Sequence, residues 1–134
     1  MIDPRIAESF ARQSMMTSLK ARLVAAHDGR CVIGAPLLDA FRQQQGAAHA
    51  AVAFALGDTA AGYAALSLMP EGQEVMTAEI KINLLSPAIG DSVEAVGEVL
   101  RAGRRLSVVR AEVFALNGQR RKSVALLQGT MVAV

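Results

Sequence analysis

A run of small apolar residues from 46 to 69 restricts the fold of this chain more than any other feature. Alanine and glycine make up much of the run, and its only acid is Asp58. A lone aspartate near the centre of a membrane span costs roughly 2.5–3.5 kcal/mol, and no second span is available to pair with it. The run therefore predicts a helix at about 49–67 that is buried in a soluble domain and does not cross a membrane.

Six segments around this helix have the pattern of β-strands: 19–27, 30–37, 75–85, 92–101, 105–116 and 122–133. Asp28–Gly29 and Asn117–Gly118 are strong hairpin signals between neighbouring strands. Pro36 indicates that the second strand lies at a sheet edge or ends there.

Two further patterns refine these elements. Asp3 followed by Pro4 is a helix-start signature and predicts a short helix at about 4–16. In the third strand, strict alternation predicts that Ile80 and Ile82 share one face while Thr77 lies on the other.

The order of helix, two strands, long helix and four strands predicts an α+β fold. Tight turns make the sheet largely antiparallel, and the long helix packs on one of its faces. The 134 residues suit one domain, residues 1–134. Just over half of the residues are hydrophobic, and a short chain this apolar often hides surface in a subunit interface, so we expect a homo-oligomer.

Basic residues gather at 101–110 and at 120–122. They are either solvated turn charges or a patch for the phosphates of a small anionic ligand such as coenzyme A. Neither cluster has interleaved aromatic residues for base stacking, and no recognition helix is evident, so we do not expect nucleic-acid binding.

Cysteine and histidine are scarce. Cys31 is the only cysteine, which excludes an intrachain disulfide and fits a buried residue in a reducing compartment. The first residues lack the continuous apolar region of a secretion signal, so we expect a cytoplasmic protein. Two histidines and one cysteine do not make a convincing zinc site, and no phosphate loop or serine-nucleophile motif is present. We expect neither a metal nor a separate cofactor.

Asp58 lies among small residues on the surface of the long helix, in a shallow cleft. A carboxylate there suits a general base or a nucleophile, although a hydroxyl or an arginine elsewhere could equally satisfy it. His49 begins the same helix nine residues earlier. Nine residues correspond to half a turn out of phase and a rise of about 13 Å, so a site that uses both side chains must draw them from two protomers.

The start of the helix offers a second chemical group. The amides of Ala50 and Ala51 belong to the first turn, where N–H groups lack intrahelical partners and lie at the positive end of the helix dipole. Such amides polarise a carbonyl and stabilise an oxyanion. Gly46 before them allows close approach, and Gln43 supplies an amide near the same entrance.

Several segments together resemble the PaaI-type hotdog thioesterases, and the resemblance extends over residues 15–134: Gln43 to Ala51, Leu56 to Ala60, Lys81 to Ala88 and Ala102 to Leu106. The resemblance implies a hotdog fold, in which a curved antiparallel sheet of about six strands wraps a long central helix. It also implies dimers or tetramers that hydrolyse acyl-CoA thioesters at the dimer interface.

The resemblance also assigns roles to individual residues. Asp58 matches the acid that activates water or attacks the thioester, and His49 with the Ala50 amide matches the groups at the thioester oxygen. Gln43 and Thr77 match orienting positions. Substrate or CoA contacts fall on the remaining matched positions: Gly46, Ala51, Thr59, Arg104 and Arg105.

One motif departs from the family pattern, because its His-Gly-Gly reads His49-Ala50-Ala51 here. Alanine keeps the amide but adds methyl groups where substrate passes. A non-catalytic acyl-CoA-binding oligomer is therefore the alternative function. A hydratase or dehydratase is a weaker one, because that chemistry needs an aspartate and a histidine close together on one short segment.

Overall fold

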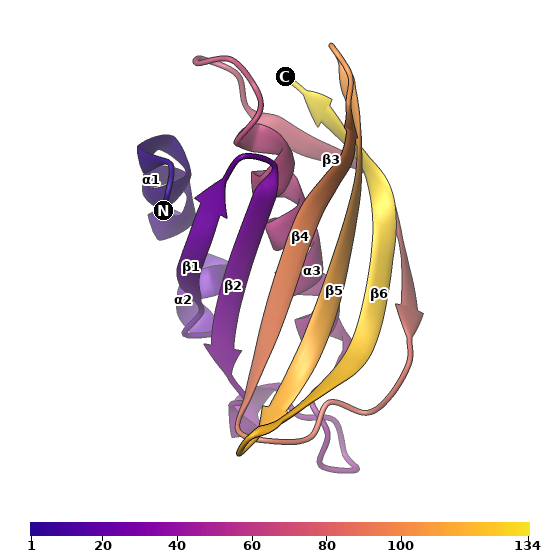
Figure 1. The fold of residues 1–134 in the computed structure, drawn as a ribbon. Coiled ribbons are helices and arrows are strands. Elements are labelled where there is room, and N and C mark those ends of the chain that lie inside the picture. Colours follow the sequence, from indigo (N-terminus) through magenta and orange to yellow (C-terminus); the bar gives the residue numbers. More distant parts are fainter.

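A computed structural model describes all 134 residues as one sheet with a long helix on one face. Figure 1 shows the layers, with the sheet curving around the helix. The elements follow in chain order: α1 Pro4–Ala11, α2 Ser14–Ser18, β1 Arg22–His27, β2 Arg30–Pro36, η1 Asp39–Phe41, α3 Ala50–Leu66, β3 Val75–Leu84, β4 Ser92–Ala102, β5 Leu106–Asn117 and β6 Arg120–Ala133. This is the hotdog fold, and the predicted fold class is confirmed.

The sheet has the strand order β1-β2-β4-β5-β6-β3, with every neighbouring pair antiparallel. Its two edges are therefore β1 and β3. The Asp28–Gly29 turn forms where expected: both residues have positive φ, at 50° and 77°, as a two-residue hairpin of type I′ requires. The second hairpin turns one residue later than predicted, at 118–119, because Asn117 still pairs with Arg120. β2 lies between β1 and β4 and ends at Pro36. Of the two explanations for this proline, the end of the strand is therefore correct, and an edge position is not.

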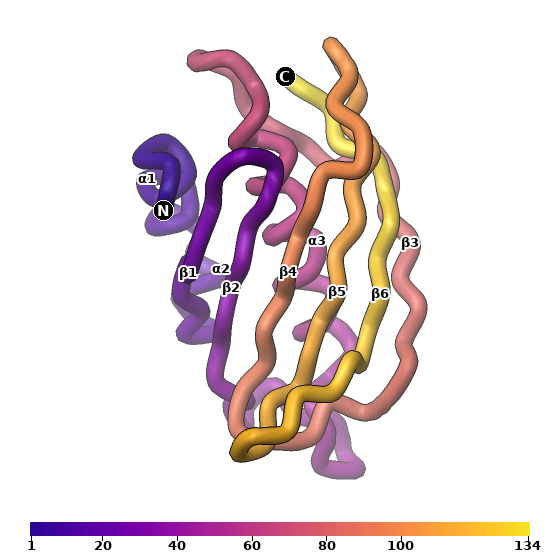
Figure 2. The backbone as a smooth tube through the Cα atoms, viewed as in Figure 1, coloured from indigo at the N-terminus to yellow at the C-terminus, as the bar shows by residue number.

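The helix predicted at 49–67 spans Ala50–Leu66, with His49 as its N-cap. No helix in the structure is both long and apolar enough to span a membrane. α3 runs from the end of the molecule that holds the β5–β6 hairpin to the end that holds the β4–β5 turn (Figure 2). Functional groups at the two ends of α3 therefore lie at opposite ends of the sheet.

The predicted N-terminal helix is divided in two, which corrects the expected single helix at 4–16. Gln13 has extended backbone at ψ 101° and begins α2. Its side-chain amide donates to the Tyr63 hydroxyl at 2.7 Å, which anchors this bend on α3. The first strand also begins at 22 instead of 19, because α2 continues to Ser18 and Lys20 takes a positive φ of 52°.

A second correction concerns β3. Its pairing with β6 shifts register between Thr77 and Glu79, so a bulge interrupts the alternation. Ile80 and Ile82 pack against the core, and Thr77 now also reaches α3, where its hydroxyl donates to Asp58. The prediction that Thr77 faces away from Ile80 was wrong, because one extra residue reverses every side chain before it.

Small residues set how closely α3 approaches the sheet. A Cβ built on Gly97 of β4 would lie 2.4 Å from the backbone carbonyl of Ala60, and one on Gly57 would lie 2.7 Å from Leu127. Both distances are far below ordinary contact. At Gly97 the helix backbone therefore rests almost directly on the sheet backbone, and at Gly57 the helix backbone packs against the Leu127 side chain. The core around this contact consists of Val, Ala and Leu side chains.

Gly97→Ala is expected to destabilise the protein by about 1–3 kcal/mol, because neither the helix backbone nor the strand can yield to the added methyl group. Urea denaturation of both proteins measures the difference. Val96→Ile, one residue earlier and half-buried, is the matched control and should change the free energy of unfolding little. Equal stability of Gly97→Ala and wild type would contradict the described contact.

A charged pair attaches α1 to the segment that follows α3. Asp3 caps α1 by accepting from the Arg5 amide at 2.9 Å, and its carboxylate contacts the Arg5 guanidinium at 2.8 Å. Arg5 in turn donates to the carbonyls of Met69 and Pro70, both at 3.2 Å. The hydrogen bonds from Arg5 lower the pKa of Asp3 below its usual 3.8.

Asp3→Ala is expected to cost about 0.5–2 kcal/mol at neutral pH, the usual value of an N-cap. Because the folded pKa is lowered, the stabilisation is complete above the unfolded value of 3.8 and is lost as the pH falls through the folded value. Urea denaturation at pH 7 and at low pH should therefore show two curves that converge in acid. Glu8→Ala, which removes an exposed pair with Arg12, is the control and should have a small effect at both pH values.

Candidate active site

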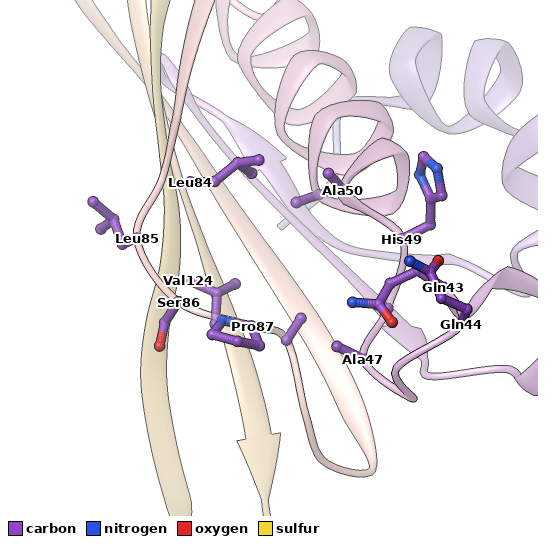
Figure 3. A pocket seen from close by; sticks show the side chains of 13 residues that line it. Gln43, Gln44, Ala47, His49, Ala50, Leu84, Leu85, Ser86, Pro87 and Val124 are labelled. Atoms are coloured by element: carbon purple, nitrogen blue, oxygen red, sulfur yellow. The ribbon is translucent and has the colours of Figure 1, made fainter.

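A pocket of about 500 Å³ opens where α3 begins. Figure 3 shows Gln43 and His49 on its helix side and Leu84, Leu85 and Pro87 on the opposite side. The segment before α3 is held tightly: the Gln43 amide donates to the Ala47 carbonyl at 2.8 Å, and the His49 amide donates to Phe41 at 2.8 Å. The predicted grouping of Gln43, His49 and Ala50 is therefore present in a single chain.

Hydrogen bonding at the N-cap sets the chemistry of His49. Its Nδ1 accepts from the Ala51 amide at 3.0 Å, so the neutral ring carries its proton on Nε2 and can donate from there. The Ala51 amide is thereby engaged. The Ala50 amide has no protein partner and lies in the first turn of the helix, where the dipole is positive. The free donors at this end of α3 are thus the Ala50 N–H and the His49 Nε2–H.

Gly46 lies in the tight turn before these donors. Its φ of 95° is one that residues with a side chain rarely adopt. The Gly46 amide donates to the Gln43 carbonyl at 3.0 Å, which folds the turn back on itself. Gly46 is exposed, and a Cβ there would meet nothing within 4 Å. This open position is compatible with the expected close approach of a substrate.

Asp58 lies in a separate, smaller pocket of about 140 Å³. Its side chain is half-buried, and its Oδ1 accepts from the Thr77 hydroxyl at 2.7 Å. The same hydroxyl lies 3.4 Å from the Met131 sulfur. From the sequence, a hydroxyl could satisfy Asp58, and the Thr77 hydroxyl does so. It bonds only Oδ1, however, and leaves Oδ2 without a protein partner.

Two residues of the Asp58 pocket were missed by sequence reasoning. Tyr63 is almost fully buried, and its hydroxyl is held by Gln13 at 2.7 Å and by Ser9 at 2.9 Å. Tyr63 is the only tyrosine of the chain and follows Asp58 by five residues, which was an available signal. Gln13 gave no such signal, because its position depends on how the N-terminal helices pack. Thr59, expected at the substrate, also borders this pocket.

The two pockets share no residue. This agrees with the rise of about 13 Å that separates His49 from Asp58 along one helix. Arg104 and Arg105 lie elsewhere again, exposed in the β4–β5 turn at the end of the sheet opposite to the start of α3 (Figure 1). One chain alone therefore brings together Gln43, His49 and Ala50, and separately Asp58 and Thr77.

Between the two pockets, a stripe of α3 is left uncovered. Ala51 and Phe54 are exposed and Ala55 is half-buried, with Phe54 at 39% exposure. The adjacent edge strand β3 also exposes Met76 and Leu84, at 61% and 58%. An exposed apolar stripe beside an unpaired strand edge is typical of an interface.

Cys31 has no part in this chemistry. It is fully buried in β2, and desolvation raises the pKa of its thiol to about 12. The thiolate needed for nucleophilic attack is therefore scarce at neutral pH. This agrees with the interpretation of Cys31 as a core residue.

Comparison with known proteins identifies the class. Residues 45–122 match the thioesterase superfamily, so the chain belongs to that superfamily and is a thioester hydrolase. A thioesterase family protein from Silicibacter pomeroyi is 37% identical, with 97% of this chain and 96% of that one covered and a TM-score of 0.95.

Two more distant structures share the fold. The Escherichia coli PaaI protein from the phenylacetic acid degradation operon is 23% identical, with 97% and 91% of the two chains covered and a TM-score of 0.85. A Bacillus halodurans protein solved with CoA is 22% identical, with 97% and 83% covered and a TM-score of 0.80. The resemblance to PaaI-type hotdog thioesterases is thus confirmed.

Proposed function

We propose that this protein hydrolyses acyl-CoA thioesters to a free acid and CoA at sites formed between two copies of the chain. The observation that carries the proposal is the division of the reactive groups along α3. The carboxylate lies in one pocket, the carbonyl-polarising donors lie in another, and an uncovered apolar stripe separates them.

A two-fold axis through that stripe explains the division. Two-fold symmetry places the same surface on both subunits and lets two α3 helices cross in opposite directions. Asp58 of one chain would then face His49 and Ala50 of the other, and the two exposed β3 edges would lie together. Dimers could pair further into tetramers.

The donors at the start of α3 suit the thioester oxygen. The Ala50 N–H and the His49 Nε2–H would bind this oxygen and stabilise the negative charge that develops on it. Ala50 and Ala51 both lie within α3 and have ordinary helical φ, so replacing the family's glycines causes no backbone strain here. This favours catalysis over the alternative of a non-catalytic acyl-CoA-binding oligomer.

Asp58 of the partner subunit would supply the carboxylate. Thr77 holds one carboxylate oxygen at 2.7 Å and leaves the other free either to take a proton from water or to attack the carbonyl. If Asp58 acts as a base, the tetrahedral intermediate collapses, the C–S bond breaks, and the proton that Asp58 took from water passes to the CoA thiolate. If Asp58 attacks the carbonyl, C–S cleavage leaves an acyl–Asp58 anhydride, and water then hydrolyses this anhydride to the free acid, supplying the proton of the CoA thiol and restoring the carboxylate. Gln43 borders the same pocket and would orient the water or the acyl group.

Several observations support CoA as the thiol component. A structure of the same fold contains CoA, although its 22% identity carries over the fold alone. In an antiparallel pair, the β4–β5 turn of one chain would approach the α3 start of the other, which would bring Arg104 and Arg105 towards the substrate. The reaction needs no metal or separate cofactor, and the lone buried Cys31 fits the cytoplasm.

The test is thiol release from a panel of aryl and straight-chain acyl-CoAs. Hydrolysis of at least one thioester by wild type, and its loss on substitution of Asp58, would support the proposal. CoA binding without hydrolysis of any thioester would favour the non-catalytic alternative.

A further inference from the structure

A second large pocket, of about 630 Å³, adjoins the one at the start of α3, and both are bordered by Pro87. Its walls are the end of the β5–β6 hairpin and the loop between β3 and β4. The wall on the hairpin side is basic, with Arg120, Arg121 and Lys122, while the loop side contributes Ile89. The proposed function gives this pocket no role.

Strand pairing shows which way the basic side chains face. Lys122 lies opposite Ala115, which is buried against the helix layer, and Arg120 lies opposite Asn117. Opposite residues of antiparallel strands share a face, and residues two apart do so as well. Lys122 and Arg120 therefore project on the same side of the sheet as α3 and the β3–β4 loop.

Arg121 lies between them and also borders the pocket, but its guanidinium faces the other side of the sheet. Its guanidinium pairs with Glu94 at 2.8 Å and stacks on the Phe114 ring at 3.5 Å. Arg120 and Lys122 make no ion pair and no side-chain hydrogen bond. The nearby Asp91 is occupied, since its carboxylate accepts from the Gly118 amide at 3.1 Å. Two unneutralised cations thus border the pocket.

The loop that forms the opposite wall is fixed in place. The Asp91 amide donates to the Leu116 carbonyl at 2.8 Å, and the Leu85 amide donates to Val124 at 2.8 Å. Gly90 makes the docking possible, because a Cβ there would lie 2.3 Å from the Leu116 oxygen. A preformed wall beside unpaired cations reduces the ordering that an anionic ligand requires on binding.

We propose that Arg120 and Lys122 bind the phosphate groups at the nucleotide end of the CoA thioester, while its acyl end passes Pro87 into the pocket at the start of α3. The inference rests on the proposed function. Both cations carry several donors, and phosphate oxygens are strong acceptors, so charge-assisted hydrogen bonds form readily. This adds phosphate contacts on the same chain as His49 to those proposed for Arg104 and Arg105 of the other chain.

The experiment compares two substrates with the same acyl group, an acyl-CoA and the corresponding acyl-pantetheine, which lacks the phosphates. The double variant Arg120→Ala/Lys122→Ala should raise KM for the acyl-CoA roughly tenfold, a modest effect for two solvent-exposed charge contacts. It should leave kcat unchanged and KM for the acyl-pantetheine unaltered. The difference between the proteins should shrink at high salt, because ions screen exposed charges.

Arg121→Gln is the control, since it removes a positive charge from the same hairpin, and the Arg121 guanidinium faces away from the pocket. It should leave both KM values near wild type. Equal losses by Arg121→Gln and the double variant, or equal losses on both substrates, would overturn the proposal. The proposal would also be overturned if Arg104→Ala raised KM for acyl-CoA and the double variant did not, because the nucleotide would then lie at the β4–β5 turn.

Failure of the proposed function gives a different result, namely no hydrolysis of either thioester by wild type. Calorimetric titration with CoA itself then decides the role of the basic pocket independently of turnover. Roughly tenfold weaker CoA binding by the double variant than by Arg121→Gln supports the site, and equal affinities reject it.

Discussion

Asp58→Asn is expected to lower kcat for thioester hydrolysis by about 10²–10⁴-fold, the usual contribution of a positioned acid or base. Asparagine has nearly the same shape and can still accept the hydrogen bond from Thr77, so the fold should survive. It carries no negative charge, so it can neither take a proton from water nor attack the carbonyl. Thiol release under saturating substrate measures the loss.

The matched control for Asp58→Asn is Thr77→Val, which retains the carboxylate but removes the hydroxyl that holds it at 2.7 Å. A positioning group of this kind should contribute much less, roughly tenfold in kcat, because a single neutral-donor hydrogen bond is lost. Wild-type turnover by a correctly folded Asp58→Asn protein would remove Asp58 from the mechanism.

Phe54→Glu is expected to convert the proposed dimer to monomers and to abolish hydrolysis almost completely. Phe54 is exposed at 39% in the isolated chain and lies in the stripe of α3 between the two pockets. A carboxylate there would be buried without a partner in the proposed interface, which strongly opposes association. Sedimentation or light scattering measures the oligomer, and the thiol-release assay measures activity on the same sample.

Val24→Glu is the control for this variant. Val24 is exposed at 47% on β1, the opposite edge of the sheet, where no shared site is proposed. It should remain oligomeric and active. An active Phe54→Glu monomer would show that one chain suffices for catalysis.

Mixing inactive variants tests the same point in another way. If Asp58 and His49 act from different chains, dimers that combine Asp58→Asn with His49→Ala contain one intact site of two. Refolding an equal mixture should restore about a quarter of the wild-type activity, because about half of the dimers are mixed. No recovery would place both residues in one chain's site.

The sequence predicted the main elements because their signals are local. The length and small apolar composition of 49–67 identified α3, and two-residue turns identified the hairpins. The bulge after Thr77 and the bend at Gln13 were not foreseen. Both depend on contacts with α3, through Asp58 and Tyr63, and a single-sequence pattern does not contain such contacts.

The site was predictable in kind but not in arrangement. Helix geometry alone indicated that Asp58 and His49 cannot meet within one chain, and their separate pockets agree with this. The His49 ring decides which amide at the start of α3 remains free. Its Nδ1 accepts a hydrogen bond from the Ala51 amide, so the Ala50 amide stays unpaired. That choice depends on a side-chain rotamer, which residue types do not specify.

The close packing of α3 on the sheet, at Gly97 against the Ala60 backbone and at Gly57 against the Leu127 side chain, restricts how enzymes of this shape can diversify. A side chain enlarged on the buried face of the helix would shift the whole helix, and with it the amide at one end and the carboxylate in the middle. New acyl preferences therefore arise more easily from changes at the rims, in the loops around Gln43 and Pro87 and at Tyr63. The helix then keeps a constant distance between the Asp58 carboxylate and the Ala50 amide, and the preference for the acyl group can change without altering that distance.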